Sequence, residues 1–431
     1  MASTIASPSG LARVRWRLST TPGQLRLAAA VLVAIAVLLG IVAAATVGSR
    51  RDAASTLAST SEPQLMRAES LYVALSDADA TAATTVLSGG IELPAQRARY
   101  VSDIRAASTQ LVTLARRATA GDERNAARVL AANMPTYIGL IESARANTRQ
   151  GYPVGAAYLR RATALMQGTM LPQALNLYIA EAQRTNDDYR TGTANGGLLA
   201  VLIVAGGLGI LLFVAQLWLF RFSKRVFNVP LVVASVLVVA LTAWVIAGLI
   251  SEQNRLSAAQ RRGSDAVQVL SATRDLALRA QRDDGLALIG RGSDSTSGKD
   301  FDAAVGALQG GHGLLVSAQP IERRSESADQ VRSVGRGLAA FGAAHREVAA
   351  SENVGKYTRA VKTYKADEAP RADALNRTLS AQTAAAQRRF AADAHAATSA
   401  TTGMKFGVPL LALALAVLAA IGLAARIREY R

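Results

Sequence analysis

The chain has 431 residues, no cysteine and a formal net charge of +17, from 48 Lys and Arg against 31 Asp and Glu. Without cysteine, disulfides, thiol catalysis and Cys-ligated metals are excluded. A basic chain can indicate nucleic-acid binding. Here, however, nearly all the acids share two long segments with most of the cations, and about half of the excess positive charge lies in three short pieces. This distribution predicts no nucleic-acid partner.

Four apolar runs without a charged side chain interrupt the sequence. A run of about 20 apolar residues is long enough to cross a bilayer as a helix, and a charge at its centre would be costly. We therefore expect transmembrane helices at 27–47, 196–220, 229–250 and 406–425. A cleaved signal peptide is the alternative for the first run, but its apolar core is longer than is usual for one. Within the second run, Gly206, Gly207 and Gly209 indicate close helix packing.

The cations between and beside these runs predict the topology. The N-terminal arm 1–26, the loop 221–228 and the tail 426–431 are rich in Lys and Arg, and such short pieces stay on the cytoplasmic side. Both termini would then be cytoplasmic in a multi-pass protein of the plasma membrane, with segments 48–195 and 251–405 outside. The residues expected to set topology or touch a cytoplasmic partner are Arg13, Arg15, Arg17, Arg221, Lys224, Arg225, Arg426 and Arg428.

The two outer segments have the periodicity of helical bundles. Tyr100, Ile104, Ala107, Leu111 and Leu114 follow a 4-3-4-3 spacing, which is typical of heptad seams. Turn signals divide 48–195 into four helices. The first ends near Leu87, and a left-handed Gly151 followed by Pro153 separates the third from the fourth. The short turns predict an up-down four-helix bundle.

The second outer segment repeats this plan at a nearly constant offset. LSDADATAATTVLSGG (75–90) aligns with LRAQRDDGLALIGRGS (278–293), and Pro172 with Pro370, about 200 residues apart. In 251–405 we expect a second helix between about Asp300 and Pro320. A fixed offset indicates an internal repeat. The predicted fold is an all-α membrane protein with four spans and two tandem up-down four-helix bundles outside.

No catalytic, cofactor or metal motif is present. The chain lacks a P-loop, GxSxG, HExxH and kinase signatures. The histidines His312, His345 and His395 have no metal-ligand spacing, and His345 falls on an apolar seam, where a hydrogen-bonded core histidine is more common than a ligand. We expect no enzyme, no cofactor and no metal.

Two features of the first outer segment are candidate functional sites. The loops 88–94 and 149–155 would meet at the end of the bundle farthest from the membrane, with Ile91, Glu92, Arg149 and Tyr152 offered to a partner; the alternative is two ordinary turns. The second feature is a layer of methionines beside prolines, which kink helices. This layer would be a hinge or a small pocket. The alternative is that methionine only fills irregular space beside the kinks. Its residues are Met134, Pro135, Met166, Met170 and Pro172.

The layout resembles the actinobacterial GlnX-type four-span transmembrane signalling proteins. The segments that carry the resemblance are LSDADATAATTVLSGG and TRQGYPVGAAYLRRATALM. The resemblance implies sensing of aspartate- or glutamate-like amino acids through a solute-binding lipoprotein, GlnH, and relay to the cytoplasmic Ser/Thr kinase PknG. More distantly, each bundle resembles the four-helix ligand domain of chemoreceptors, although the signalling coil of those receptors is absent.

The predicted function is that of a transmembrane sensor or adaptor. About 300 residues are expected outside the cell and only about 40 in the cytoplasm. We therefore expect another protein, such as a Ser/Thr kinase, to carry the signal onward in the cytoplasm. A homodimer is left open. The alternatives are a structural scaffold of the cell envelope and a small-solute transporter or channel, although the spans lack the ionisable residues usual in transporters.

Overall fold

A computed structural model describes residues 21–87, 93–118, 121–192, 196–223, 229–260, 265–289, 325–400 and 403–429. All regular secondary structure in these ranges is helical. The chain divides into two compact units. One comprises residues 1–55, 189–256 and 395–431, and is called the apolar unit. The other comprises 56–188 and 257–394, and is called the helical sensor unit after the role that the sequence predicts for it.

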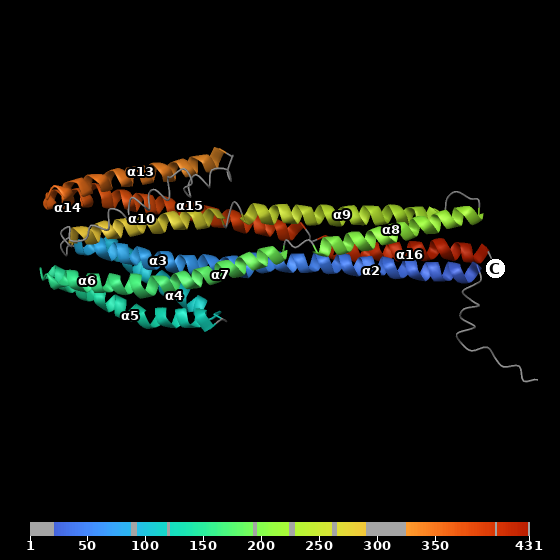
Figure 1. The fold of residues 1–431 in the computed structure, drawn as a ribbon, viewed down its shortest axis with the longest axis horizontal. Coiled ribbons are helices and arrows are strands. Elements are labelled where there is room, and N and C mark those ends of the chain that lie inside the picture. Colours follow the sequence, from blue (N-terminus) through green and yellow to red (C-terminus); the bar gives the residue numbers. More distant parts are fainter. Residues whose placement is uncertain are drawn as a thin grey trace, which may run out of the picture. The chain divides into compact units, whose positions relative to one another are not determined.

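The apolar unit is built from four helices, which Figure 1 shows side by side. Their shared core comes from Leu39, Leu208, Val245 and Leu415, one from each helix. Each helix is long and apolar enough to cross a membrane, which confirms the four predicted runs. The helices are α2 (Thr21–Thr56), α8 (Gly196–Ser223), α9 (Val229–Ala259) and α16 (Met404–Glu429).

Close packing in the apolar unit depends on other glycines than those predicted. A Cβ added to Gly40 would lie 2.5 Å from the Cβ of Ala412, and one on Gly407 would lie 2.4 Å from the Trp244 ring. The prediction for Gly206, Gly207 and Gly209 is wrong, since nothing lies within 4 Å of a Cβ at any of them. These three glycines lie in the predicted second run, but at positions of α8 that no other described helix approaches closely.

The first half of the helical sensor unit is a bundle of four helical rods around one core. The rods pack Leu75, Leu130, Ile141, Leu159 and Met166 together. As predicted, the first rod ends at Leu87, and Gly151 takes the left-handed conformation with φ +73° before the last rod begins. The elements are η1 (Leu57–Ser61), α3 (Glu62–Leu87), α4 (Pro94–Ala115), α5 (Gly121–Arg149), α6 (Val154–Leu165), η2 (Met166–Met170) and α7 (Leu171–Gly192).

The second half contains three described rods. Leu338 and Phe341 pack with Leu375 and Leu379 in one cluster, and Leu288, Val348 and Tyr364 form another. The predicted helix between about residues 300 and 320 lies outside the described residues. The elements are α10 (Asp265–Ile289), α13 (Ser325–Asn353), α14 (Tyr357–Thr363), η5 (Tyr364–Glu368) and α15 (Ala369–Ala400).

The two halves of the helical sensor unit meet along α3 and α10 (Figure 1). Ser76 donates a hydrogen bond to Asp275, 199 residues further along the chain. Arg274 binds Asp77, 197 residues away, and Arg279 donates to the Tyr72 hydroxyl, 207 residues away. Residues about 200 apart therefore lie side by side on these helices.

Three π-helical turns among the fully described elements interrupt the rods, and each ends two residues before a proline. They are η1, η2 and η5, which end at Ser61, Met170 and Glu368, with Pro63, Pro172 and Pro370 following. A proline inside a helix has no N–H to donate and its ring crowds the carbonyl of the preceding turn. A local π-turn relieves that crowding while the rod continues. Pro135, inside α5, is not preceded by such a turn.

Candidate functional site

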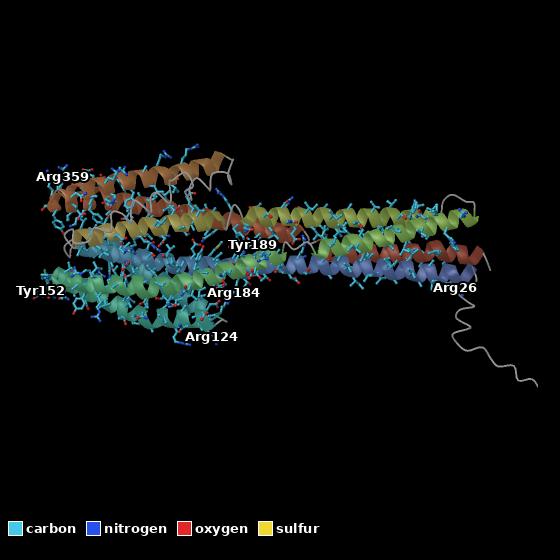
Figure 2. All side chains as sticks on the ribbon, in the orientation of Figure 1. Arg26, Arg124, Tyr152, Arg184, Tyr189 and Arg359 are labelled. Carbon is cyan, nitrogen blue, oxygen red and sulfur yellow. The ribbon has the colours of Figure 1, made fainter. Side chains whose placement is uncertain are left out.

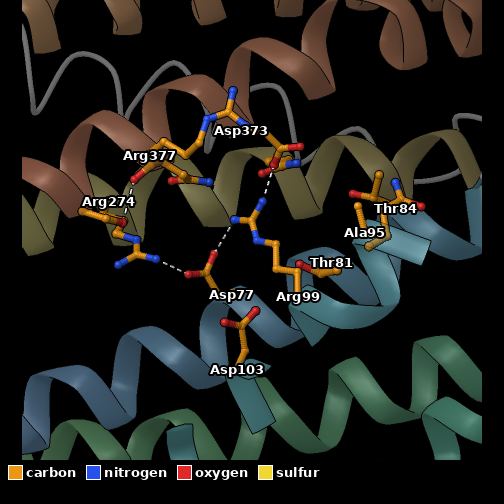
Figure 3. A pocket seen from close by; sticks show the side chains of 13 residues that line it. Asp77, Thr81, Thr84, Ala95, Arg99, Asp103, Arg274, Asp373 and Arg377 are labelled. Atoms are coloured by element: carbon orange, nitrogen blue, oxygen red, sulfur yellow. Dashed lines mark hydrogen bonds and ion pairs between the residues drawn. The ribbon is translucent and has the colours of Figure 1, made fainter. Parts of the chain in front are cut away.

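A polar pocket of about 470 Å³ opens where α3 and α4 of the first half face α10 and α15 of the second. Figure 3 shows four charged side chains, one from each of these helices, pointing toward one another: Asp77, Arg99, Arg274 and Asp373. The lining residues are Asp77, Thr81, Thr84, Ala95, Gln96, Arg99, Asp103, Arg274, Gln281, Asp373, Asn376, Arg377 and Ser380.

Asp77 is the centre of the charge network in the pocket. Its side chain is 3% exposed and binds two guanidinium groups, those of Arg99 at 2.9 Å and of Arg274. Arg99 also donates to Asp373 over 2.5 Å. The side chain of Arg99 thus joins a carboxylate of α3 to a carboxylate of α15 (Figure 3). The network ties the two halves together across the pocket.

Asp103, on α4, lies beside this network with one oxygen buried and without a hydrogen-bond partner among the described residues. Burial and the nearby Asp77 carboxylate raise the pKa of Asp103 to about 7, against the opposing effect of Arg99 and Arg274. A carboxyl group with this pKa changes charge near neutrality. The group therefore gains most from a ligand that brings positive charge to its free oxygen.

Several other polar atoms of the pocket also lack partners. Asn376 is 2% exposed, and neither its amide nitrogen nor its oxygen makes a hydrogen bond to a described residue. Three more buried atoms make no hydrogen bond to a described residue: the side-chain oxygens of Gln96 and Gln281, and the Nε of Arg274. Buried polar groups are normally hydrogen-bonded, and leaving one unpaired costs about 1–3 kcal/mol. The pocket thus offers donors and acceptors to a small polar ligand.

The chemistry of the pocket fits a ligand that carries both charges. Carboxylates come from Asp77, Asp103 and Asp373, and guanidinium groups from Arg99 and Arg274. Pockets with a few convergent polar groups and perturbed pKa values are candidate binding sites.

The predicted partner-binding loops are described only in part. Arg149 is exposed at the end of α5, and Tyr152 is 54% exposed in the turn that follows (Figure 2). Ile91 and Glu92 lie outside the described residues. The docking role of these four residues stays a prediction.

The predicted layer of methionines is part of the bundle core. Met134, Met166 and Met170 are at most 6% exposed and pack in the main cluster. Pro135 and Pro172 are exposed. Pro172 lines a smaller cavity of about 310 Å³ together with Tyr72, Gln167 and Arg279, whereas the methionines do not. Met166 and Met170 bound the π-turn η2, so a hinge there stays a prediction.

Of the cations expected at the cytoplasmic side, Arg221 is exposed near the end of α8. Arg426 and Arg428 belong to α16, while Arg13, Arg15, Arg17, Lys224 and Arg225 lie outside the described residues.

Sequence reasoning missed the pocket residues. Most carboxylates in the outer segments have an arginine nearby in sequence, which is the pattern of solvated helix faces. The sequence therefore offers no reason to single out Asp77, Arg99, Asp103, Arg274 and Asp373. One local signal was available. Asp77 and Asp79 occur in an Ala-rich stretch, SDADATAA, where two acids without a neighbouring cation are unusual on a helix face that must pack.

Four apolar helices and an all-helical unit with a charged pocket suggest a membrane protein with a sensor domain. Residues 53–190 match the family model of an actinobacterial sensor domain. This match covers the first half of the helical sensor unit and includes Asp77, Arg99 and Asp103. No curated protein and no solved structure matches the chain. The match supports a sensing role and fits an actinobacterial sensor protein.

Proposed function

We propose that the chain is a transmembrane sensor that binds a small zwitterionic solute of the amino-acid class and relays the signal to a cytoplasmic protein. The observation that carries the proposal is the pocket between the two halves. In it Asp103 and Asn376 keep buried polar atoms without partners among the described residues, beside a network of arginines and carboxylates. An amino acid brings an ammonium group for Asp103 and a carboxylate for Arg99 or Arg274.

The network gives such a ligand a way to act on the protein. A ligand carboxylate at Arg99 competes with Asp373, and the bond between Arg99 and Asp373 is one that joins the halves. A ligand shifts an equilibrium only by its difference in affinity for two states. A coupling of about 1–3 kcal/mol is enough for signalling. Exchange of one charged hydrogen bond is of that size.

The relay follows from the topology that the cations predict, with the helical sensor unit outside the cell. Helical residues run without a break from Thr21 to Leu87, so Asp77 and the first apolar run belong to one continuous helical stretch. By the resemblance to GlnX-type proteins, the outer partner is a solute-binding lipoprotein, and a Ser/Thr kinase reads the cytoplasmic pieces. The predicted tip residues Ile91, Glu92, Arg149 and Tyr152 are the docking surface that we propose for the lipoprotein.

We further infer that the two halves are tandem bundles that arose by duplication. Gly151 and Gly355 both take the left-handed conformation, with φ +73° and +72°. Both precede a short helix, a π-turn and then a proline, at Pro172 and Pro370. The shared order of irregular features supports the repeat, because each feature alone is uncommon.

The binding test uses the full chain in lipid nanodiscs. Isothermal titration with L-aspartate, L-glutamate and L-glutamine as probes is expected to give one site per chain. Asn376→Leu should abolish binding without weakening the fold, since it replaces an unsatisfied buried amide by an apolar side chain of similar size. Asn133→Leu is the control, because Asn133 bonds the backbone of its own helix, at Val129, and lies outside the pocket.

The outcomes separate the two routes of sensing. Binding that occurs with the purified chain and is lost only in Asn376→Leu supports a direct sensor. Binding that requires the lipoprotein and is unaffected by Asn376→Leu contradicts the pocket and leaves an adaptor that docks a loaded partner. If nutrient-dependent phosphorylation of the kinase's substrates survives replacement of 88–94 and 149–155 and deletion of 426–431, the relay is refuted and a scaffold is favoured.

The topology has its own test in this cysteine-free chain. Arg149→Cys should react with a membrane-impermeant thiol reagent in intact cells, whereas Ser223→Cys should react only after the cells are opened. Labelling of Ser223→Cys in intact cells would reverse the topology and exclude the outer position of the pocket.

A further inference from the structure

A cluster of three buried ligand-type side chains lies in the second half of the helical sensor unit, apart from the pocket. Asp284 comes from α10, His345 from α13 and Glu368 from the last position of η5. One ligand atom of each lies within 4.8 Å of the others. The Nδ1 of His345 is 2.6 Å from the Asp284 carboxylate and 3.9 Å from that of Glu368. Three rods thus converge on one point.

The cluster holds more carboxyl groups than the described residues around it pair with cations. Asp284, His345 and Glu368 are at most 6% exposed. Neither oxygen of Glu368 accepts a hydrogen bond from a described residue, and one oxygen of Glu352, which interacts with His345, is also buried without a partner. Arg282 lies two residues before Asp284 in the sequence, and its guanidinium group binds Asp283. Among the described residues, no Lys or Arg forms an ion pair with Asp284 or Glu368.

Buried carboxylates are normally paired with cations or coordinate metals. A core histidine would need one acceptor, and Asp284 already supplies it. The second carboxyl group, that of Glu368, lies beside Asp284 and His345, and no described Lys or Arg pairs with it. Its place at a π-turn is also significant, because single π-turns occur frequently at functional sites. The excess of acceptors over donors indicates that a cation belongs between them.

We propose that Asp284, His345 and Glu368 bind a divalent transition-metal ion of the Zn²⁺ type. An imidazole nitrogen with carboxylate oxygens suits first-row transition metals, whereas Mg²⁺ and Ca²⁺ prefer oxygen alone. Zinc binds His nitrogen at about 2.0–2.1 Å and carboxylate oxygen at about 2.0–2.2 Å. Atoms that lie within 4.8 Å of one another reach such an ion with small side-chain movements.

The metal would join three rods that local sequence does not hold together. It links α10 and α13 to the turn η5, whose first residue, Tyr364, donates a hydrogen bond to the Gln281 carbonyl at 3.2 Å. The site is independent of the amino-acid pocket, since none of its three ligands lines that pocket.

The test measures metal content and thermal stability of the full chain in nanodiscs. The protein is stripped with a chelator, given Zn²⁺, Mg²⁺ or Ca²⁺, and passed through gel filtration before elemental analysis. The wild-type chain is expected to retain about one Zn²⁺ per chain and no Mg²⁺ or Ca²⁺, with a Tm that rises on loading. Equal uptake of Mg²⁺ or Ca²⁺, or no retained Zn²⁺, would overturn the proposal.

Two variants separate a metal site from a core that merely needs these side chains. Glu368→Gln replaces a buried carboxyl group by an amide of the same shape, so the metal-free protein should still fold while Zn²⁺ retention falls at least tenfold. His345→Gln should also lose the ion. His395→Gln, which removes an exposed histidine of α15, should retain it. Retention of Zn²⁺ by Glu368→Gln at the wild-type level would refute the site even if the other results agree.

Discussion

Arg99 and Asp373 form an ion pair of 2.5 Å although 274 residues separate them along the chain. The same guanidinium group binds Asp77, which is buried, whereas Asp373 is 40% exposed. One arginine therefore holds two carboxylates in different environments, and this difference makes the strength of each contact testable.

Asp77→Asn should destabilise the helical sensor unit by about 3 kcal/mol, because it leaves two arginines without their buried partner. Asp373→Asn should cost less than about 1 kcal/mol, since exposed ion pairs are weak. Urea unfolding in nanodiscs followed by far-UV circular dichroism would measure both. Tryptophan fluorescence would not serve, because Trp16, Trp218 and Trp244 all lie outside this unit. Equal losses in the two variants would contradict the assigned burial.

The pocket should bind an ammonium-bearing ligand less tightly in acid. Asp103 has a pKa raised to about 7 by burial and by Asp77, and only its ionised form attracts the ligand's ammonium group. Affinity for L-glutamate should therefore be constant above about pH 7 and fall by up to tenfold per unit below it. Titration calorimetry from pH 5.5 to 8.5 checks this. Asp103→Asn should bind more weakly and lose the pH dependence. If the affinity of this variant still falls with pH as in the wild type, another group causes the pH dependence.

Asp79 should make the protein less stable as the pH rises. Its carboxyl group is fully buried and accepts hydrogen bonds from Tyr137 at 3.2 Å and Thr163 at 3.1 Å. Burial raises its pKa from the ordinary 3.8 to about 6. Between these values the folded chain keeps a proton that the unfolded chain releases, so this stabilising contribution is complete below about pH 4 and is lost by about pH 6.

Asp79→Asn removes this titration. The free energy of unfolding of the wild-type chain, relative to the variant, should fall by about 3 kcal/mol between pH 4 and pH 7. Asp122→Asn, at an exposed position in the first turn of α5, should follow the wild type. A constant difference between wild type and Asp79→Asn across this range would show that Asp79 stays ionised in the folded protein.

Two glycines of α5 and its C-terminal turn should respond in opposite directions to alanine. Gly151 has φ +73°, which costs an L-residue about 1 kcal/mol, so Gly151→Ala should destabilise. Gly139 is exposed inside α5 with open space at its Cβ, so Gly139→Ala should stabilise by up to about 1 kcal/mol. Urea midpoints in nanodiscs would measure both. Destabilisation by both variants would place Gly139 against an unseen partner.

The features that could be predicted from sequence depend on neighbouring residues. The four apolar runs, the end of α3 at Leu87 and the turn at Gly151 follow from composition, a Gly pair and a Gly–Tyr–Pro sequence. Partners in the pocket and the metal cluster are 22 to 274 residues apart, and no local rule pairs them. The close approach at Gly40 likewise depends on Ala412, which only the packed helices bring near.

The π-turns η2 and η5 have a further consequence for these rods. A π-turn holds one residue more than an α-helical turn would, so its loss or gain changes the winding of everything beyond it by about 100° and its rise by about 1.5 Å. The rods α6–η2–α7 and α14–η5–α15 each contain such a turn between a left-handed glycine and an apolar run of the sequence. In each half of the chain, one helical rod can therefore rotate by a fixed amount, through loss or gain of its π-turn, without breaking the helix. Deleting Gly168 from η2 would lock that step in one position.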